Sequence, residues 1–256
     1  MRSATQILLA VGSLAIAVNS YAQQPAPAGR GATPAAPAAA GRGAAPAVPP
    51  PSLYYRESFS SDKAVFTARP LATTDVANAN LELKMYGPGA PAKPDHESGI
   101  QLDSAASDPL VPGRMVTWVW TGMTEDNWAV TLRDKQNYVD LSLPLARIRW
   151  RVRMRGANEL RPVVKLADGT MLVGDYREPA STQWRENEFF LVDVPRWRVL
   201  DPKAVIGSTD SAWRVKPDLS KVDEVGFTDL MRGAGHGTAG NSGVDWIEVY
   251  GNPVKR

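Results

Sequence analysis

Apolar residues fall at every second position in many short stretches of this chain. The clearest stretch is Arg147–Arg155, where Ile148, Trp150, Val152 and Met154 alternate with five arginines. This alternation predicts an extended strand with one buried side and one side facing solvent. No stretch keeps an apolar period of 3.6 residues over three turns, so no helix is predicted.

Similar stretches recur along the chain, separated by turns rich in Gly, Pro and Asp. The predicted strands are Tyr55–Phe59, Leu81–Tyr86, Met115–Thr121, Trp128–Leu132, Tyr138–Leu141, Arg147–Arg155, Arg161–Leu166, Met171–Asp175, Glu188–Val194, Val222–Thr228 and Val244–Tyr250. Many short strands without helices predict an all-β fold, an antiparallel β-sandwich of the jelly-roll type.

The first 22 residues have the pattern of an export signal. Arg2 provides the positive start, Ile7–Val18 forms an apolar run, and Ser20 and Ala22 are the small residues at a cleavage site. The run is too short to span a bilayer comfortably, so we expect cleavage rather than a membrane anchor, and no transmembrane segment in the mature chain. The predicted location is secreted or periplasmic. Because the chain has no cysteine, its stability cannot depend on disulfides.

Residues 23–51 are rich in Ala, Pro and Gly and predict a disordered linker. The folded domain is then predicted at 52–256. Three of the 29 basic residues and none of the 27 acidic residues precede this domain, which leaves it a formal net charge of −1. This balance, and the two isolated arginines of the linker, argue against nucleic-acid binding. We expect a monomer.

The order of several segments resembles galactose-binding-domain-like jelly rolls, a group that includes carbohydrate-binding modules and the complex-I intermediate-associated domain. The resembling segments are Tyr138–Ser142, Ile148–Gly156, Glu188–Pro195, Pro217–Phe227 and Val244–Tyr250. The resemblance covers roughly Trp118 to Tyr250. It implies a scaffold that mostly binds sugars without cleaving them.

The same resemblance implies a possible structural calcium ion where the first and last strands meet. The matching positions in this chain are Glu57 and Asp245. Calcium prefers oxygen ligands, and two carboxylates from distant segments would join the ends of the domain. The alternative is that Glu57 forms a salt bridge and Asp245 caps a turn.

Tryptophans are the leading candidates for contact with a sugar, because a flat ring stacks on the apolar face of a pyranose. Trp118 and Trp120 are two residues apart in one strand and therefore share a face. Trp184 and Trp197 lie beside arginines in polar sequence, which favours a surface platform. Core packing is the alternative for Trp118 and Trp120, and Trp150 is expected in the core.

The arginine side of the strand Arg147–Arg155 has two interpretations. Arg149 and Arg151 are candidates for gripping an acidic glycan. Alternatively, this side is a solvated outer face paired with carboxylates such as Glu186 and Glu188. His236, in a glycine-rich loop, is a further candidate for ligand contact.

An enzyme is the less favoured prediction. The segment Gly243–Glu248 superficially resembles the Glu-x-Asp-x-x-Glu motif of family 16 glycoside hydrolases, but Gly243 stands where the nucleophile would be. We therefore expect an exported carbohydrate-binding module, with a polysaccharide or envelope glycan as partner and no catalytic residues. The alternatives are a secreted glycoside-hydrolase-like enzyme and a structural or protein-binding envelope module.

Overall fold

The computed structural model describes residues 48–59, 68–91, 99–108, 111–120, 126–156, 159–207, 213–229 and 241–256. The predicted export signal, most of the predicted linker and His236 lie outside these residues. Within them, the sole helix is a single 3-10 turn, Leu191–Asp193, and no helix is long and apolar enough to cross a membrane.

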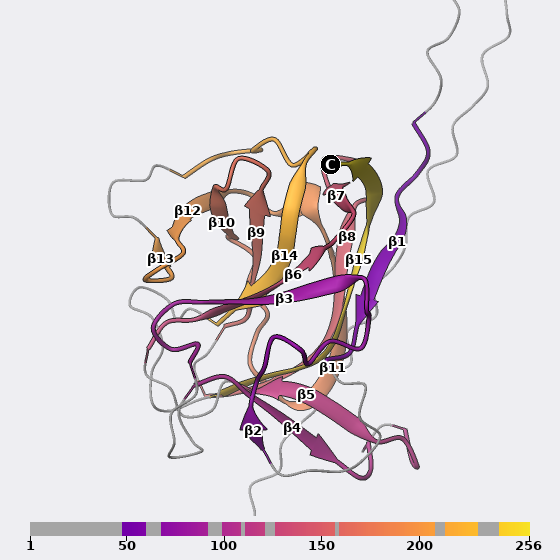
Figure 1. Cartoon of the computed structure of the whole chain (residues 1–256), viewed down its shortest axis with the longest axis vertical. Helices are drawn as coiled ribbons and strands as arrows, with labels where there is room; N and C mark the ends of the chain where they lie inside the picture. The colour runs from indigo at the N-terminus through magenta and orange to yellow at the C-terminus, as the bar shows by residue number, and fades with distance from the viewer. Residues whose placement is uncertain are drawn as a thin grey trace, which may run out of the picture. The chain divides into compact units, whose positions relative to one another are not determined.

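Two sheets are joined by the long strand β15, Asn241–Lys255 (Figure 1). Sheet I has the order β11 (Ser181–Phe190), β8 (Arg147–Arg155), β15, β5 (Val116–Trp120), β4 (Gln101–Ala105) and β2 (Arg69–Pro70), with β1 (Ser52–Glu57) also paired to β15. Sheet II has the order β13 (Ile206–Gly207), β12 (Trp197–Asp201), β10 (Met171–Gly174), β9 (Arg161–Leu166), β14 (Val222–Thr228), β6 (Ala129–Asp134) and β3 (Leu81–Tyr86).

The short strand β7 (Asn137–Asp140) pairs with β14 and with the last residues of β15. Because β15 pairs with β8 through Tyr250 and with β7 from Asn252 onward, it passes from sheet I to sheet II. Each strand pair among the described residues is antiparallel.

The hydrophobic core lies between the two sheets. The apolar side of β8 contributes Trp150, which is fully buried, together with its neighbours Ile148, Val152 and Met154. Phe227 of β14 belongs to the same cluster. The two sides of β8 predicted from the alternation are therefore observed. One side lies in the core, and the other forms the outer face of sheet I.

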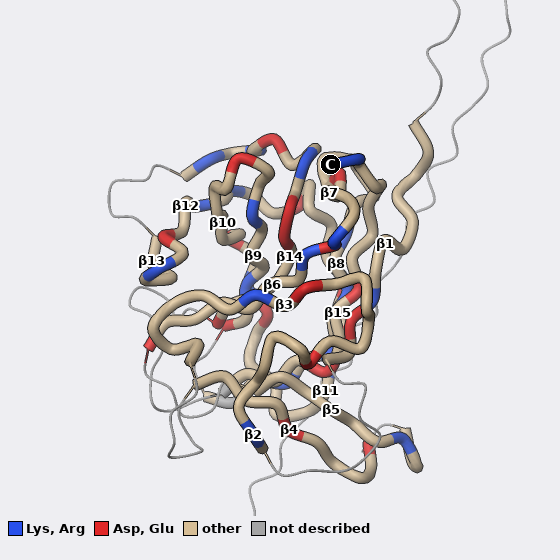
Figure 2. The backbone as a smooth tube through the Cα atoms, viewed as in Figure 1, with Lys and Arg blue, Asp and Glu red and all other residues tan. Residues whose placement is uncertain are grey.

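The all-β, antiparallel prediction is confirmed. Four predicted strands have the observed bounds, namely Leu81–Tyr86, Arg147–Arg155, Arg161–Leu166 and Val222–Thr228. The strands β4 and β12 were not predicted from the sequence. The strand predicted at Glu188–Val194 instead begins at Ser181 and ends at Phe190, and the 3-10 turn follows it. Acidic and basic positions are interspersed over the described strands, in agreement with the small net charge (Figure 2).

Candidate functional site

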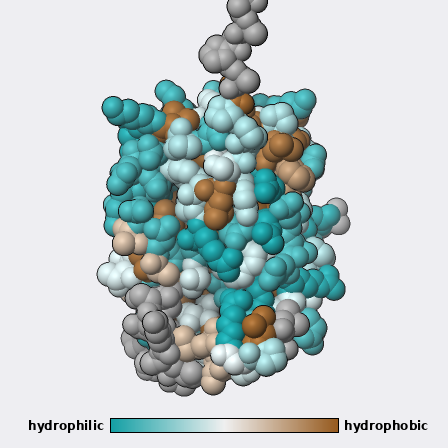
Figure 3. Space-filling view, turned by 90° about the vertical axis from the view of Figure 1, so that its right-hand side faces the viewer, coloured by the Kyte–Doolittle hydropathy of each residue, from teal (hydrophilic) through white to brown (hydrophobic). Residues whose placement is uncertain are grey.

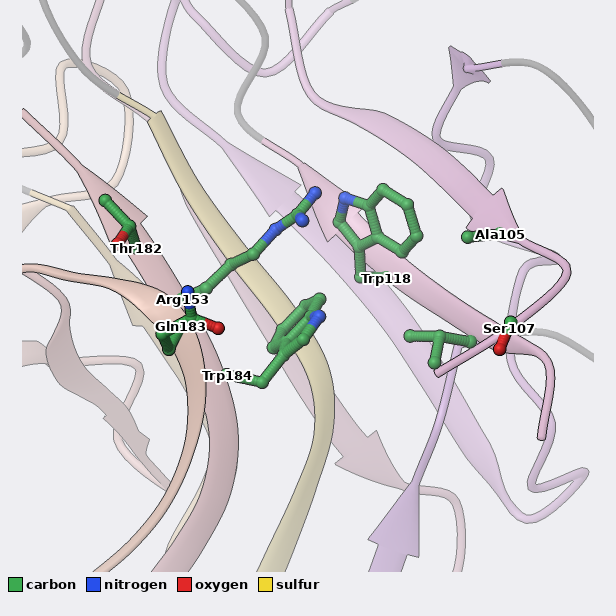
Figure 4. Close-up of a pocket in the computed structure, with 8 residues that line it drawn as sticks. Ala105, Ser107, Trp118, Arg153, Thr182, Gln183 and Trp184 are labelled. Atoms are coloured by element: carbon green, nitrogen blue, oxygen red, sulfur yellow. The ribbon is translucent and has the colours of Figure 1, made fainter. Parts of the chain in front are cut away.

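A pocket of about 250 Å³ opens on the outer face of sheet I (Figure 4). Its described lining combines two indole rings, one guanidinium group, one amide and two hydroxyls. The lining residues are Ala105, Ser107, Val116, Trp118, Arg153, Thr182, Gln183 and Trp184. The space-filling view of the side that carries β1 shows a mostly hydrophilic surface with small, separate apolar spots (Figure 3).

Trp118 and Trp184 come from strands that are not neighbours. Trp118 lies on β5 and Trp184 on β11, with β15 and β8 between them in the sheet. Their rings meet edge to face, with centroids 5.9 Å apart, and each residue is only 6% exposed. With Val116 they form a small apolar cluster separate from the inter-sheet core, and the partly buried Trp120 packs against it. The predicted shared face of Trp118 and Trp120 is thus confirmed.

Gly243 of β15 lies between the strands that carry Trp118 and Arg153. It pairs with Arg153 of β8 on one side and with Trp120 of β5 on the other. A Cβ atom at Gly243 would lie 3.3 Å from Cδ1 of Trp118 and 3.4 Å from Cγ of Arg153. Without a side chain at this position, Trp118 and Arg153 can occupy the space above β15.

Arg153 covers both rings. Its guanidinium carbon lies 4.6 Å from the ring centroid of Trp118 and 4.8 Å from that of Trp184, within the range of cation–π attraction. Asp103 stands opposite Trp118 in the strand register. Burial raises the pKa of Asp103 above its ordinary value, while a hydrogen bond from the Ser104 amide and the charge of Arg153 act in the opposite direction.

Arg151 forms a buried ion cluster beside the pocket lining. It is 1% exposed, and its guanidinium donates to Asp108 at 2.6 Å and to Asp245. Arg114 also donates to Asp245, at 2.9 Å. Arg151 lies 5.0 Å from the ring of Trp184, and Asp108 follows the lining residue Ser107, so this ion cluster is adjacent to two parts of the lining.

A bulge in β15 explains how Asp245 reaches this cluster. Val244 pairs with Val152, but the next pair is Trp246 with Arg151, so Asp245 is an extra residue. Val244 therefore faces the core, while Asp245 and Trp246 both lie on the outer face with Arg151.

Two further outer arginines of β8, Arg147 and Arg149, form carboxylate pairs on a solvated face. Arg147 donates to Glu188 at 2.9 Å, and Arg149 donates to Glu248 at 3.1 Å and lies 3.8 Å from Glu186. The interpretation of this side as a paired outer face is confirmed for Arg147 and Arg149. Arg149 and Arg151 lie outside the described lining of the pocket.

Trp197 does not form the surface platform expected from its arginine neighbours. It is 1% exposed and belongs to the inter-sheet core. Because neighbours in a strand point to opposite sides, Arg196 and Arg198 lie on the other side, where both contact the ring of Trp213. The arginines that flank Trp197 in the sequence therefore lie on the opposite face of β12 and do not indicate that Trp197 is exposed.

Glu57 and Asp245 occupy opposite faces of sheet I. Glu57 is 1% exposed and pairs with the core residue Ile247. Its carboxylate accepts hydrogen bonds from the backbone amides of Ser58, Phe59, Ala77 and Asn78. A shared calcium ion would have to displace these bonds and the arginines of Asp245. Calcium binding stays a prediction, and the described geometry does not bring its two proposed ligands together.

Arg153, Gln183, Thr182 and Ser107 line the pocket but are not among the ligand residues predicted from the sequence. Arg153 belongs to the same alternating run as Arg149 and Arg151, and the run alone does not tell which arginine reaches a pocket. Gly243 gave no signal either, because the predicted strand begins at Val244 and only the structure places Gly243 inside β15.

The fold and the pocket define an antiparallel β-sandwich with an aromatic pocket on one outer face. No protein-family model and no curated protein matches the chain. Among solved structures it is similar to the family 11 carbohydrate-binding module of the cellulosomal cellulase Lic26A-Cel5E of Clostridium thermocellum, with 17% identity, a TM-score of 0.40, and coverage of 74% of this chain and 96% of that one.

A second similar structure is the family 11 module from Clostridium thermocellum in complex with a β-1,3-1,4-mixed-linked tetrasaccharide, with 17% identity, a TM-score of 0.40, and coverage of 75% and 100% of the two chains. A third is an exo-β-agarase, with 10% identity, a TM-score of 0.38, and coverage of 70% of this chain and 24% of that one. The first two are carbohydrate-binding modules. Because these TM-scores lie below 0.5, no ligand or activity is transferred to this chain.

Proposed function

We propose that this protein is an exported carbohydrate-binding module that does not cleave its ligand. The observation that carries this proposal is the pocket itself, in which Trp118 and Trp184 meet beneath Arg153 and beside Gln183. Aromatic surface suits the apolar face of a sugar ring, and a few polar groups fix its orientation.

The size of the pocket limits what it can hold. Its volume of about 250 Å³ is below the roughly 300–1,000 Å³ of pockets that enclose larger ligands. Because each indole is only 6% exposed, a sugar contacts ring edges and the Arg153 side chain rather than a broad open platform. We therefore propose that the pocket takes one sugar unit, at a chain end or within a polysaccharide.

Binding without cleavage is favoured over hydrolysis by the chemistry of the lining. Hydrolysis of a glycosidic bond commonly uses two carboxylates held on either side of that bond. None of the eight described lining residues carries a carboxylate. A secreted glycoside hydrolase and a structural or protein-binding envelope module remain the competing functions.

Retention on polysaccharide gels tests the proposal. The purified protein is run through native gels that contain neutral or acidic polysaccharides, and the same mixtures are assayed for new reducing ends. We expect retardation by at least one polysaccharide and no product. Release of product would establish the hydrolase instead, whereas the absence of retardation by every polysaccharide would favour the structural module.

A pair of tryptophan variants locates the site. Trp184→Ala is expected to weaken retention by about 1–3 kcal/mol, the range of an aromatic hot spot. The control is Trp213→Ala, which removes a partly buried tryptophan that lies outside the pocket lining. Melting curves select conditions in which both variants are folded. Equal retention of folded Trp184→Ala and wild type would show that the sugar binds elsewhere.

Export is proposed from the leader pattern of residues 1–22. Mass spectrometry of protein secreted by its native host should find an N-terminus near Gln23. Exported material that retained Met1 would contradict the proposed cleavage.

A further inference from the structure

We propose that this protein forms a symmetric dimer, in which the free edge of β3 pairs antiparallel with β3 of a second copy. This inference goes beyond the proposed function, because β3 belongs to sheet II whereas the proposed sugar pocket lies on sheet I. It starts from a strand edge that the described part of the fold leaves open.

β3 forms one edge of sheet II. All six of its residues pair with β6 without a register shift, and no other described strand pairs with β3 (Figure 1). The amide of Lys135 donates to the carbonyl of Asn80, so Asn80 and every second residue after it bond to the β6 side. The backbone N–H and C=O groups of Leu83 and Met85 therefore point toward the open edge.

A groove of about 760 Å³ runs beside this edge. All six residues of β3 line it, together with Thr73, Thr74, Val76 and Lys135. Six residues of a strand extend over about 20 Å. A groove that follows a strand along its whole length, beside outward-pointing N–H and C=O groups, suits an added strand better than a compact ligand.

The other free edges among the described strands have features that hinder pairing. β2 and β13 contain two residues each, and one residue of β2 is a proline. The pairing of β1 with β15 and that of β11 with β8 each contain an irregularity. β3 is the regular edge strand of the described set, so the search for a partner strand leads to it.

The charges on the outer face of β3 favour a second copy as that partner strand. Glu82 and Lys84 are two positions apart and therefore share this face, where their side chains are 36% and 41% exposed. When Leu83 pairs with the partner's Leu83, Lys84 lies opposite the partner's Glu82 and Glu82 lies opposite the partner's Lys84. Opposite charges at directly paired positions stabilise a pair of strands.

A lysine in an edge strand commonly protects that edge from pairing. In β3 this protection is matched, because the same strand in a second copy brings a carboxylate to the lysine. Within the chain, Thr131 of β6 stands opposite Lys84, so β6 provides no carboxylate at this position. β11 has the opposite pattern, since Glu186 and Glu188 share its outer face and would meet like charges in a second copy.

The expected dimer is weak. Leu81 and Leu83 are 1% and 2% exposed in the single chain, so pairing buries little further apolar surface at these residues. Its affinity then depends on backbone hydrogen bonds and on two reciprocal ion pairs, which salt screens. A dimer also carries two sugar pockets, and attachment at two points of one polysaccharide strengthens retention without any new contact.

Sedimentation velocity of the purified protein over a wide concentration range tests self-association. We expect the mass to rise from that of one chain toward that of two as the concentration increases, and to rise less at high salt. A mass of one chain at every concentration, which is the monomer expected from the sequence, would refute the dimer.

Charge reversal tests the register. Lys84→Glu and Glu82→Lys each turn both ion pairs into like-charge pairs, and each is expected to weaken self-association roughly tenfold or more. An equimolar mixture of the two variants should associate again, because a chain with two glutamates then faces a chain with two lysines. The control is Glu186→Lys, which reverses an exposed carboxylate on β11 and should change self-association less than about twofold. Melting curves select conditions in which all variants are folded.

Amide hydrogen exchange followed by NMR locates the interface on one side of β3. The amides of Leu83 and Met85 should become protected as the concentration rises, because they bond only in the dimer. The amide of Lys84, which faces β6, serves as the control and should be protected at every concentration.

The outcomes separate this proposal from carbohydrate binding. Self-association without a change at Leu83 and Met85, or a mixture of the variants that associates no better than each alone, would place the interface elsewhere and overturn the proposed pairing. Retention of a strictly monomeric protein on a polysaccharide gel would refute the dimer alone. A dimer that no polysaccharide retains would refute carbohydrate binding alone.

Discussion

Replacement of Arg151 by methionine should destabilise the domain strongly, although Arg151 is one of several arginines that look equivalent in the sequence. The side chain of Arg151 is 1% exposed, and its two carboxylate partners, Asp108 and Asp245, are 0% and 3% exposed. Arg151→Met keeps a long, unbranched side chain but leaves buried negative charges behind. Removal of one partner from a buried ion pair costs about 3–5 kcal/mol.

Arg114 reduces the expected cost of Arg151→Met toward the lower end of the range of about 3–5 kcal/mol. It is 34% exposed and already lies 2.9 Å from Asp245 and 3.7 Å from Asp108, so it neutralises part of the charge that Arg151→Met leaves. For a domain of this size each kcal/mol shifts the melting temperature by about 2–4 °C, which predicts a fall of roughly 6–20 °C.

Thermal unfolding followed by circular dichroism measures the effect, with Arg147→Met as the control. Arg147 is 23% exposed and its partner Glu188 is 39% exposed, so its ion pair is worth at most about 1 kcal/mol. Neutralisation of both acids, in Arg151→Met with Asp108→Asn and Asp245→Asn, should recover part of the loss. A melting temperature for Arg151→Met no lower than that of Arg147→Met would refute the account of a buried ion cluster.

Three further predictions address the core, a close strand contact and the pocket. Trp150→Ala empties a fully buried site and should lower the free energy of unfolding by about 3–5 kcal/mol, measured by urea titration. Gly226→Ala should destabilise by about 1–3 kcal/mol in the same assay, because a Cβ atom there would lie 1.9 Å from the carbonyl oxygen of Val130. Arg153→Gln should raise the pKa of Asp103 further, since the ionised carboxyl loses a favourable charge; carboxyl NMR titration would contradict this by showing no change or a fall.

The fold class followed from alternation, and the strands with the strongest alternation were placed best. Arg147–Arg155 and Val222–Thr228 were predicted with their observed bounds because each has one apolar side against the core. β4, with the sequence Gln-Leu-Asp-Ser-Ala, was missed because it has one large apolar residue, Leu102, and its pairing with β5 depends on distant residues. The local pattern of apolar and polar residues does not show which distant strand a segment pairs with.

The sequence indicated the types of residue that line the pocket, tryptophan and arginine, but not which individual residues do so. Of the two tryptophans predicted as a surface platform because they lie near arginines, Trp184 lines the pocket whereas Trp197 fills the core. The two have similar neighbours in sequence, and only the side of the strand distinguishes them. The register with β10 fixes that side for Trp197, whereas Trp184 lies in an irregular stretch of β11, between the residues that pair with Met154 and Val152 of β8. Register is a property of pairing between distant segments, so a single strand does not reveal it.

The arginines of β8 show how one repeated residue type acquires different roles along one strand. Arg149 lies at the surface, where solvent screens its pairs and makes each worth little. Arg151 forms ion pairs with Asp108 and Asp245 where solvent is excluded, so the loss of Arg151 would cost much more stability. Arg153 lies over two indole rings and beside Gly243. Since alternation places all three on one face, the segments that cover the face decide which arginine is structural and which can meet a ligand.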